Sequence, residues 1–429
     1  MGGKTRAAAR AYLDATGADL PDLTADTASD WCAAADADAD YAALRDFAYG
    51  PNGVLPRDVV FRAMQRPPHT RVTGCGRVYP YQLEELESMA PVLKISGYNS
   101  RMDNAAAVPG AREAERFATA IADVTVSAYV TEDADALTRI VGVLATWARA
   151  GAFLDTLNCV QPDGYISSRG ACTQWTRSDG QDPSGIKDWT MPTMLMAGLA
   201  RNYHALLQDH EADTLAEDHA AIARWLGPDL SRRIPTPRDV YFGVNMAYYW
   251  PTAVSDMAAG RTTRAQDRLR RLHDGIVRLM NEDGSITDRT TRGDRALWYQ
   301  HTSIGEAVMS FEMMRAAGVP VSARAEQRLH AAVDLFLRAV DDYAVLDPWA
   351  RQRHNGSYKG GTQDWNRMGW PSTNFGGSWF HVYPYRYPDH PNAARLRAKV
   401  SWRQGSATRD TDFGVGVGCI YNLAAGVVN

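Results

Sequence analysis

The sequence has no excess of charge of either sign. Its 46 Lys and Arg residues are balanced by 50 Asp and Glu residues, which gives a formal net charge of -4 at pH 7. No Lys- or Arg-rich block stands out along the chain. Because nucleic-acid binding depends on a concentrated positive field, no nucleic-acid partner is expected. Any anion must be recognised by local cations.

Cysteine is scarce and scattered. The five cysteines form no Cys-x-x-Cys pair, and their odd number leaves at least one outside any intramolecular disulfide. Isolated cysteines usually pack as small apolar side chains. The ten histidines show neither His-Glu-x-x-His nor His-x-His spacing, so a tight metal site is not expected.

Long apolar runs are also missing. No stretch approaches the roughly 20 apolar residues that a membrane-spanning helix requires, so no membrane partner is expected. The N-terminus begins with basic residues, but Asp14 and Asp19 interrupt it before an apolar core of signal-peptide length. The chain as written is therefore expected to be cytoplasmic. A chain already trimmed of an export signal would look the same and would be secreted or periplasmic.

Helical periodicity dominates from about residue 112 onward. Apolar residues recur at three- and four-residue intervals, which is typical of amphipathic helices, and glycine or proline marks most joints. The patterns recur as pairs roughly every fifty residues. These pairs are 111–130 with 133–154, 188–209 with 217–227, 240–260 with 261–285, and 294–318 with 322–342.

Such pairs predict an all-α fold. Helical hairpins that cannot each bury an apolar face alone must stack into a solenoid or close into a toroid, although a large irregular bundle would show similar periodicity. We expect residues 1–110 to form an irregular N-terminal region packed on the helical domain of residues 111–429. The aromatic-rich part from about Trp349 could stack on sugar rings or close the core.

Three stretches carry a resemblance to a known family. They are "ATWARAGAFL", the helix around "NMAYYWPTAV", and "EDGSITDRTTRGDRALWYQHTSIGEAV". In order and approximate spacing they resemble the alginate lyase-like polysaccharide lyases, over roughly the middle half of the chain. The resemblance implies an incomplete (α/α) toroid that cleaves an acidic polysaccharide or oligosaccharide by β-elimination, with neither a metal nor an organic cofactor.

That chemistry requires three roles. A cation must neutralise the uronate carboxylate, a base must remove the neighbouring C–H proton, and an acid must protonate the departing glycosidic oxygen. In the family these roles are carried by two helical motifs, and this sequence departs from both.

The first motif has lost its usual base. In the family it reads Asn-Asn-His-Ser-Tyr-Trp, with the second Asn and the His in the active site. Matching the Tyr-Trp pair to Tyr249 and Trp250 leaves Asn245 at the first Asn. Met246 then replaces the second Asn and Ala247 replaces the His.

The second motif is also altered. It usually reads Arg-Ala-Leu-x-Tyr-His-Asn-Tyr, in which the Arg and the last Tyr serve the active site. The sequence "RALWYQHT" keeps Arg295 and Tyr299 but has Gln300, His301 and Thr302 at the last three positions. Because catalytic positions have changed in both motifs, altered chemistry is favoured over a chance loss at one site.

The remaining cations suit the first role. Arg295 and Tyr299 fall four residues apart and therefore share a helix face. The planar guanidinium of arginine can bind a carboxylate through two hydrogen bonds. Arg292 and Arg289 could extend Arg295 into an anion-attracting strip, or they could belong to a solvated helix start.

Proton transfer has three candidates. Tyr248 adjoins the position of the missing His, Tyr299 lies near Arg295, and His301 is a natural base, although a lone helical histidine is more often structural. The preferred arrangement has Arg295 and Asn245 holding an acidic group while Tyr248 or Tyr299 exchanges protons. A packing role for both tyrosines stays open.

Further residues are predicted to contact the substrate. Tyr98 and Arg101 lie in "LKISGYNSRMDN", where the family often has a lid loop, and Gly97 would let that loop move. Trp189, Trp250 and His381 complete the set with Arg292. The Tyr249-Trp250 pair also matches a part of the motif that is not catalytic, which favours packing for Trp250.

Three functions remain open from the sequence. The first is a lyase with relocated acid and base groups acting on an acidic glycan. The second is a repurposed toroid that performs elimination, dehydration or cyclisation on a small acidic substrate. The third is a binder of acidic glycans without catalysis. The sequence does not reveal the oligomeric state.

Overall fold

The structure is a computed structural model and contains only helices among its regular elements, within the residues it describes. An isolated antiparallel bridge joins Met280 and Ile286. The predicted all-α fold class is therefore confirmed. The described residues are 80–93, 110–131, 133–154, 190–209, 215–233, 239–242, 244–353, 360, 361, 363, 377 and 379–399.

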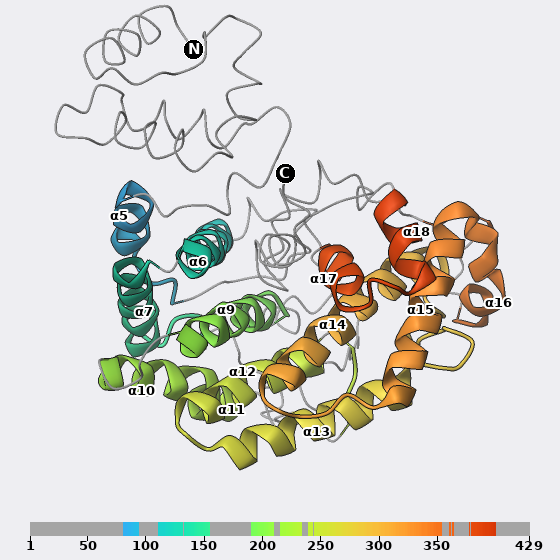
Figure 1. Ribbon diagram of the computed structural model, residues 1–429. Helices are drawn as coiled ribbons and strands as arrows, with labels where there is room; N and C mark the ends of the chain where they lie inside the picture. The colour runs from blue at the N-terminus through green and yellow to red at the C-terminus, as the bar shows by residue number, and fades with distance from the viewer. Residues whose placement is uncertain are drawn as a thin grey trace, which may run out of the picture.

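The longer helices of the described part follow one another as five pairs (Figure 1). The first four of these pairs are the ones that the sequence predicts. They are α6 (Ala111–Thr131) with α7 (Ala134–Arg149), α9 (Thr190–Asp209) with α10 (Ala216–Arg224), α12 (Val244–Ala258) with α13 (Thr262–Leu279), α14 (Ala296–Ala316) with α15 (Ala323–Asp341), and α17 (Trp379–Arg386) with α18 (Pro391–Lys399).

The pairs form two concentric arcs. The first members, α6, α9, α12, α14 and α17, make the inner arc, and the second members lie outside them (Figure 1). Helices α9, α12 and α14 therefore have inner helices on both sides and an outer helix behind them, whereas α6 and α17 are the ends of the arc within the described residues. This arrangement is the incomplete (α/α) toroid that the sequence predicts.

Burial patterns follow from these positions. Outer helix α13 buries Ala265, Leu269, Leu272 and Ile276, which recur at four- and three-residue intervals on one face. Inner helix α14 is buried on all sides from Ser303 to Met314. A helix that is buried all round needs apolar neighbours on every face, and α14 has them in α13, α15 and α17.

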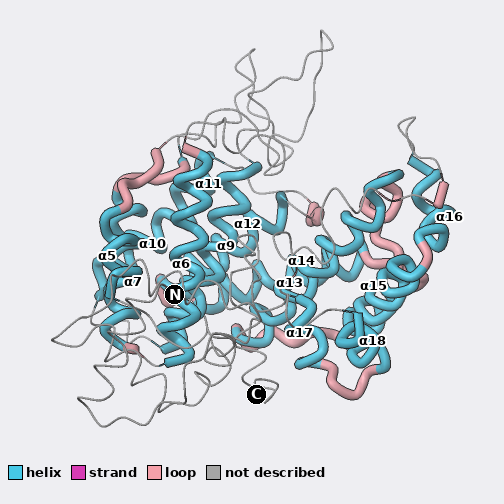
Figure 2. Tube along the Cα trace, turned by 90° about the horizontal axis from the view of Figure 1, so that it is seen from above, coloured by secondary structure: helices cyan, strands magenta, loops and turns pink. Residues whose placement is uncertain are grey.

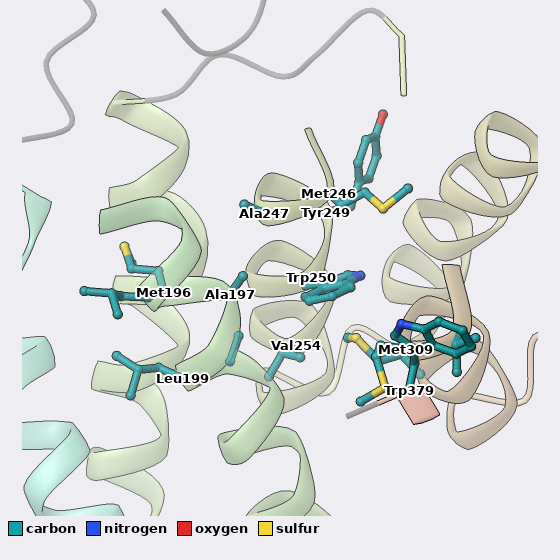
Figure 3. Packing of buried hydrophobic residues seen from close by; sticks show 14 of the residues in the cluster. Met196, Ala197, Leu199, Met246, Ala247, Tyr249, Trp250, Val254, Met309 and Trp379 are labelled. Carbon is teal, nitrogen blue, oxygen red and sulfur yellow. The ribbon is translucent and has the colours of Figure 1, made fainter. Parts of the chain in front are cut away.

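Trp250 ties three inner helices together (Figure 3). Its indole nitrogen donates a hydrogen bond to the Ser310 hydroxyl on α14 at 2.9 Å. The Arg201 guanidinium, from α9, lies 5.6 Å from the centre of the Trp250 ring and donates to the Met309 carbonyl at 2.7 Å. The core thus runs continuously from α9 through α12 to α14.

Helix α13 lies next to both α12 and α14 (Figure 2). The segment before α12 reaches the end of α13, where Arg278 and Asp239 form an ion pair at 3.4 Å. The chain passes from that end of α13 into α14. The described part also contains the short elements η4 (Trp225–Asp229), α11 (Leu230–Arg233), η5 (Gly293–Arg295), η6 (Tyr343–Leu346), α16 (Asp347–Ala350) and η7 (Arg351–Arg353).

Helix α5 (Pro80–Ser88) packs against α6 and α7, and the Val92 carbonyl that follows it accepts a hydrogen bond from the Phe153 amide at 3.0 Å. The rest of the predicted N-terminal region lies outside the described residues, so its boundary at residue 110 stays a prediction. None of the described helices is long and apolar enough to cross a membrane.

Candidate active site

A segment between α13 and α14 carries Arg289, Arg292 and Arg295, and a tight turn fixes where it begins. Gly284 has a φ of 86°, in the left-handed region. A Cβ atom there would lie 2.3 Å from the Ala331 carbonyl oxygen of α15. Only glycine satisfies both conditions, so the turn can pack directly on α15.

Gln300 holds this segment against the inner helix. Its amide oxygen accepts a hydrogen bond from the Thr290 hydroxyl at 2.6 Å, and its amide nitrogen donates to the carbonyls of Gly284 at 2.7 Å and Ala332 at 3.2 Å. Gln300 is fully buried, where an unpaired amide would be costly. Gln300, which stands at the histidine position of the second family motif, therefore positions the segment that carries the three arginines.

Gln363 fixes the start of α14. Its amide oxygen accepts a hydrogen bond from the Leu297 backbone amide at 3.0 Å, and its amide nitrogen donates to the Gly293 carbonyl at 3.3 Å. A free amide in the first turn of the helix is satisfied in this way. Arg295 is consequently held at the helix start with its side chain exposed.

Tyr299 lies between two cations. The guanidinium carbon of Arg289 is 5.3 Å from the centre of the Tyr299 ring, and that of Arg292 is 5.0 Å from it. Both distances fit a cation–π interaction. Trp298 packs at a tilt on the same ring, with the centroids 4.6 Å apart. Tyr299 is partly exposed and Arg292 is exposed, so both can meet a ligand.

Arg289 is the deepest cation of the segment. Desolvation lowers the pKa of its guanidinium, and the carboxylate of buried Glu306 is the strongest opposing influence. Arginine nevertheless stays protonated in proteins. Arg289 is therefore partly neutralised by Glu306, whereas Arg292 and Arg295 present their charge to solvent. A solvated helix start fits these two residues but not Arg289.

Tyr248 faces a different neighbour from the one expected. The Arg268 side chain of outer helix α13 interacts with the Tyr248 hydroxyl, and it donates a hydrogen bond to buried Asp256 at 2.6 Å. Only 2% of Tyr248 is exposed. Because Arg268 meets both Tyr248 and Asp256, this face of α12 packs against α13. A direct role in proton transfer is disfavoured.

His301 lies in an aromatic cluster. Its Nδ1 atom accepts a hydrogen bond from the Trp379 indole nitrogen at 3.1 Å, so that nitrogen carries no proton. The rings of Phe336 and Phe380 pack around it at centroid distances of 5.8 and 5.2 Å. Because His301 is 3% exposed, these contacts fit the structural alternative and disfavour the catalytic one.

The other predicted contacts divide into buried and undescribed residues. Trp250 and His381 are each 2% exposed, which disfavours a direct substrate contact for both. Asn245 lies in the first turn of α12, and its side chain is not described. Tyr98, Arg101 and Trp189 lie outside the described residues, so their roles stay predictions.

His204 is a partly exposed residue that the sequence did not single out. It follows Arg201 by three positions on inner helix α9, so the two side chains share a face. Burial and, next, the charge of Arg201 lower the pKa of His204 to about 4, which keeps it neutral at pH 7. The only sequence signal was the short Arg-to-His spacing within an apolar helix.

The described residues contain no group of three or more His, Cys, Asp or Glu side chains that could hold a metal ion. The side chains of the arginine segment and of the start of α14 that are open to a ligand include those of Arg292, Arg295 and Tyr299. The exposed Arg292 guanidinium lies over the partly exposed Tyr299 ring, and the exposed Arg295 precedes Tyr299 by one turn. Arginine can bind a carboxylate, and a phenol can exchange a proton.

Comparison with known proteins identifies the family of the chain. No curated protein matches the chain. The family model described as "Alginate lyase" matches residues 80–345, which is more than half of the chain and includes the segment from Arg289 to Tyr299. The chain belongs to the alginate lyase family.

Proposed function

We propose that this protein cleaves a uronate-containing polysaccharide by β-elimination, with Tyr299 as the proton-transfer group. The observation that carries the proposal is the position of the Tyr299 ring between Arg289 and Arg292, one turn after Arg295. Family membership supports lyase chemistry at the level of the reaction class. The choice of residues rests on exposure and charge.

In this mechanism the exposed arginines bind the acid group. Arg295, with Arg292 or Asn245, holds the uronate carboxylate and withdraws charge from it, which acidifies the adjacent C–H bond. Tyr299 acts as its phenolate, and the proton passes from that carbon to the phenolate oxygen. The electron pair of the C–H bond forms a carbon–carbon double bond and the glycosidic C–O bond breaks. The Tyr299 phenol formed in this way returns the proton to the departing oxygen, which restores the phenolate.

Exposure favours Tyr299 among the three proton-transfer candidates. A base must come within hydrogen-bond reach of the substrate. Tyr299 is partly exposed, whereas Tyr248 and His301 are enclosed by α13 and by the aromatic cluster of α17. Tyr299 therefore replaces both the His and the last Tyr of the family motifs.

The test measures the unsaturated uronate product by its ultraviolet absorbance, on a panel of alginate, glucuronan and hyaluronan. We expect a rise with the wild-type protein that is lost in Arg295→Ala. The matched control is Arg270→Ala, because Arg270 is exposed on outer helix α13, where it pairs with Asp267. Arg270→Ala should keep wild-type activity.

The alternatives predict different results. Polymer that binds without forming product would support the non-catalytic binder. Failure to bind any of the polymers would favour a small acidic substrate. Activity that survives in Arg295→Ala would show that the carboxylate is held elsewhere.

A further inference from the structure

Two large apolar side chains are conspicuously exposed among the described residues. Tyr241 has 48% of its surface exposed and Leu93 has 47%. Single exposed apolar residues are common and need no explanation by themselves. Tyr241 differs from Leu93 in how it is held and in where it lies.

The neighbours of Tyr241 fix its direction. Val240 and Phe242 are buried on either side of it. Val240 packs so closely on α13 that a Cβ atom at Gly275 would lie 2.2 Å from the Val240 Cβ atom. With both neighbours anchored in the core, the Tyr241 side chain points outward. A ring presented in this way loses little conformational entropy when a ligand covers it.

Tyr241 also lies at the end of the ring that carries the arginine segment. It directly precedes inner helix α12, and the nearby Asp239 pairs with Arg278 in the last turn of α13. The chain passes from that turn to Arg292 and Arg295 at the start of α14. The exposed ring and the exposed cations therefore belong to the same end of the toroid.

The chemistry of the ring suits a sugar. One face of a pyranose is apolar, and an aromatic ring can cover it while the hydroxyl groups at the rim remain hydrated. A polymer bound with one carboxylate at Arg295 must continue along this end of the ring. Its neighbouring sugars need contacts that do not depend on charge.

We propose that Tyr241 is a stacking platform for a sugar ring of the polymer next to the reacting unit. The inference rests on the proposed function and extends it, because it predicts that affinity increases with chain length. Tyr241 takes no part in proton transfer. It is a positioning residue that favours long uronate polymers over short fragments.

The experiment compares Tyr241→Ala and Tyr241→Phe with the matched control Leu93→Ala. Binding of alginate and glucuronan is measured by retardation in affinity gels, and KM and kcat are measured on polymer and on a short oligosaccharide. Tyr241→Ala should weaken polymer binding and raise KM about tenfold, the loss expected for one aromatic contact. Its kcat should be unchanged, and its KM on the short oligosaccharide should change little.

The controls separate stacking from other effects. Tyr241→Phe keeps the ring and should behave as wild type, and Leu93→Ala should do the same. An equal loss in Tyr241→Phe would assign the effect to the hydroxyl and overturn the platform. Unchanged binding in Tyr241→Ala would also overturn it.

Binding and product formation are read independently, so the two proposals can fail separately. Polymer binding that depends on Tyr241 without any product would overturn the lyase function and leave the platform standing. Product formation with normal KM in Tyr241→Ala would overturn the platform alone. A wild-type protein that binds neither polymer would overturn both.

Discussion

Tyr248 and Tyr299 look equivalent in the sequence but have opposite surroundings. Tyr299 is partly exposed between two guanidinium groups, and Tyr248 is enclosed beside Arg268. Tyr299→Phe should therefore lower kcat by about 10²- to 10⁴-fold, the usual contribution of general acid–base catalysis. Its stability should stay close to wild type, as measured by denaturant unfolding.

Tyr248→Phe should give the reverse result. It removes a buried hydroxyl that interacts with Arg268, which should lower the free energy of unfolding by about 1 kcal/mol and leave kcat unchanged. Steady-state kinetics and urea unfolding on both variants test the pair. A large fall in kcat for Tyr248→Phe, with normal activity in Tyr299→Phe, would transfer the proton-transfer role to Tyr248.

Asp256 is a buried charge on which the junction of α12 and α13 depends. Its carboxylate pairs with Arg261 at 2.7 Å, Arg268 at 2.6 Å and Arg264 at 3.4 Å, and its side chain is 3% exposed. Asp256→Asn should lower the free energy of unfolding by about 3 kcal/mol, because it leaves the partly buried Arg268 without its counter-charge. The control Asp267→Asn removes only an exposed pair and should cost less than about 1 kcal/mol in the same urea titration.

Residue spacing predicted these clusters only in part. The sequence correctly places Tyr248 on a helix, next to the position of the missing His. It does not reveal that Tyr248 meets Arg268 of α13, because α12 has apolar neighbours on more than one side. The hydrogen bond between His301 and Trp379 could not be predicted from the sequence either, because it joins positions far apart in the chain.

At the level of the helices, the start of α18 is sensitive to pH. His390 accepts a hydrogen bond from the Asn392 backbone amide at 3.2 Å, stacks on His330 at 4.0 Å, and shares the Tyr383 hydroxyl with it. Desolvation lowers the pKa of both histidines, and that of His330 falls to about 4 with help from the charge of His390. The carboxylates of Glu326 and Asp334 oppose these shifts only weakly.

The sign of the pH dependence follows from these pKa values. The folded state binds these protons less readily than the unfolded state, in which histidine titrates near 6.5. The free energy of unfolding should therefore be highest above pH 6.5 and fall as the pH drops towards about 4. His390→Asn keeps a side chain that can cap a helix but cannot titrate in this range. The unfolding temperature Tm, measured from pH 7.5 to 4.5, should fall less steeply in His390→Asn than in the wild type. Identical slopes of Tm against pH would contradict the role of the histidine pair.

The sequence predicted helix pairs best where periodicity was strong. The first four pairs have regular apolar spacing and clear glycine or proline joints, so local pattern and final structure agree. The fifth pair was missed because α17 is short, contains Pro384 and is rich in aromatics, which gives no helical period. The hydrogen bond from Gln363 to the start of α14 could not be predicted either. Gln363 lies far along the chain from Leu297, and a single glutamine forms no recognisable sequence pattern.

For the whole molecule, the ring extends beyond the family match. The match ends at residue 345, whereas α17 packs against α14 and contributes Trp379 and Phe380 to the core. Arg386 of α17 also binds the Glu312 carboxylate through two hydrogen bonds, at 3.0 and 2.7 Å. The fifth pair therefore covers one side of α14 and shares its core.

This arrangement predicts where the ring opens first. Helix pairs that contact mainly their neighbours transmit instability over short distances. Trp379→Ala should leave a cavity that costs about 3–5 kcal/mol, and amide hydrogen exchange should lose protection in α17, α18 and the facing parts of α14. The matched variant is Trp147→Ala. It removes the stacking partner of Phe117 in the first helix pair, at the opposite end of the arc from α17. Protection should then be lost in α6 and α7 and kept in α17. Equal loss along the whole ring in both variants would show instead that the five pairs unfold as one cooperative unit.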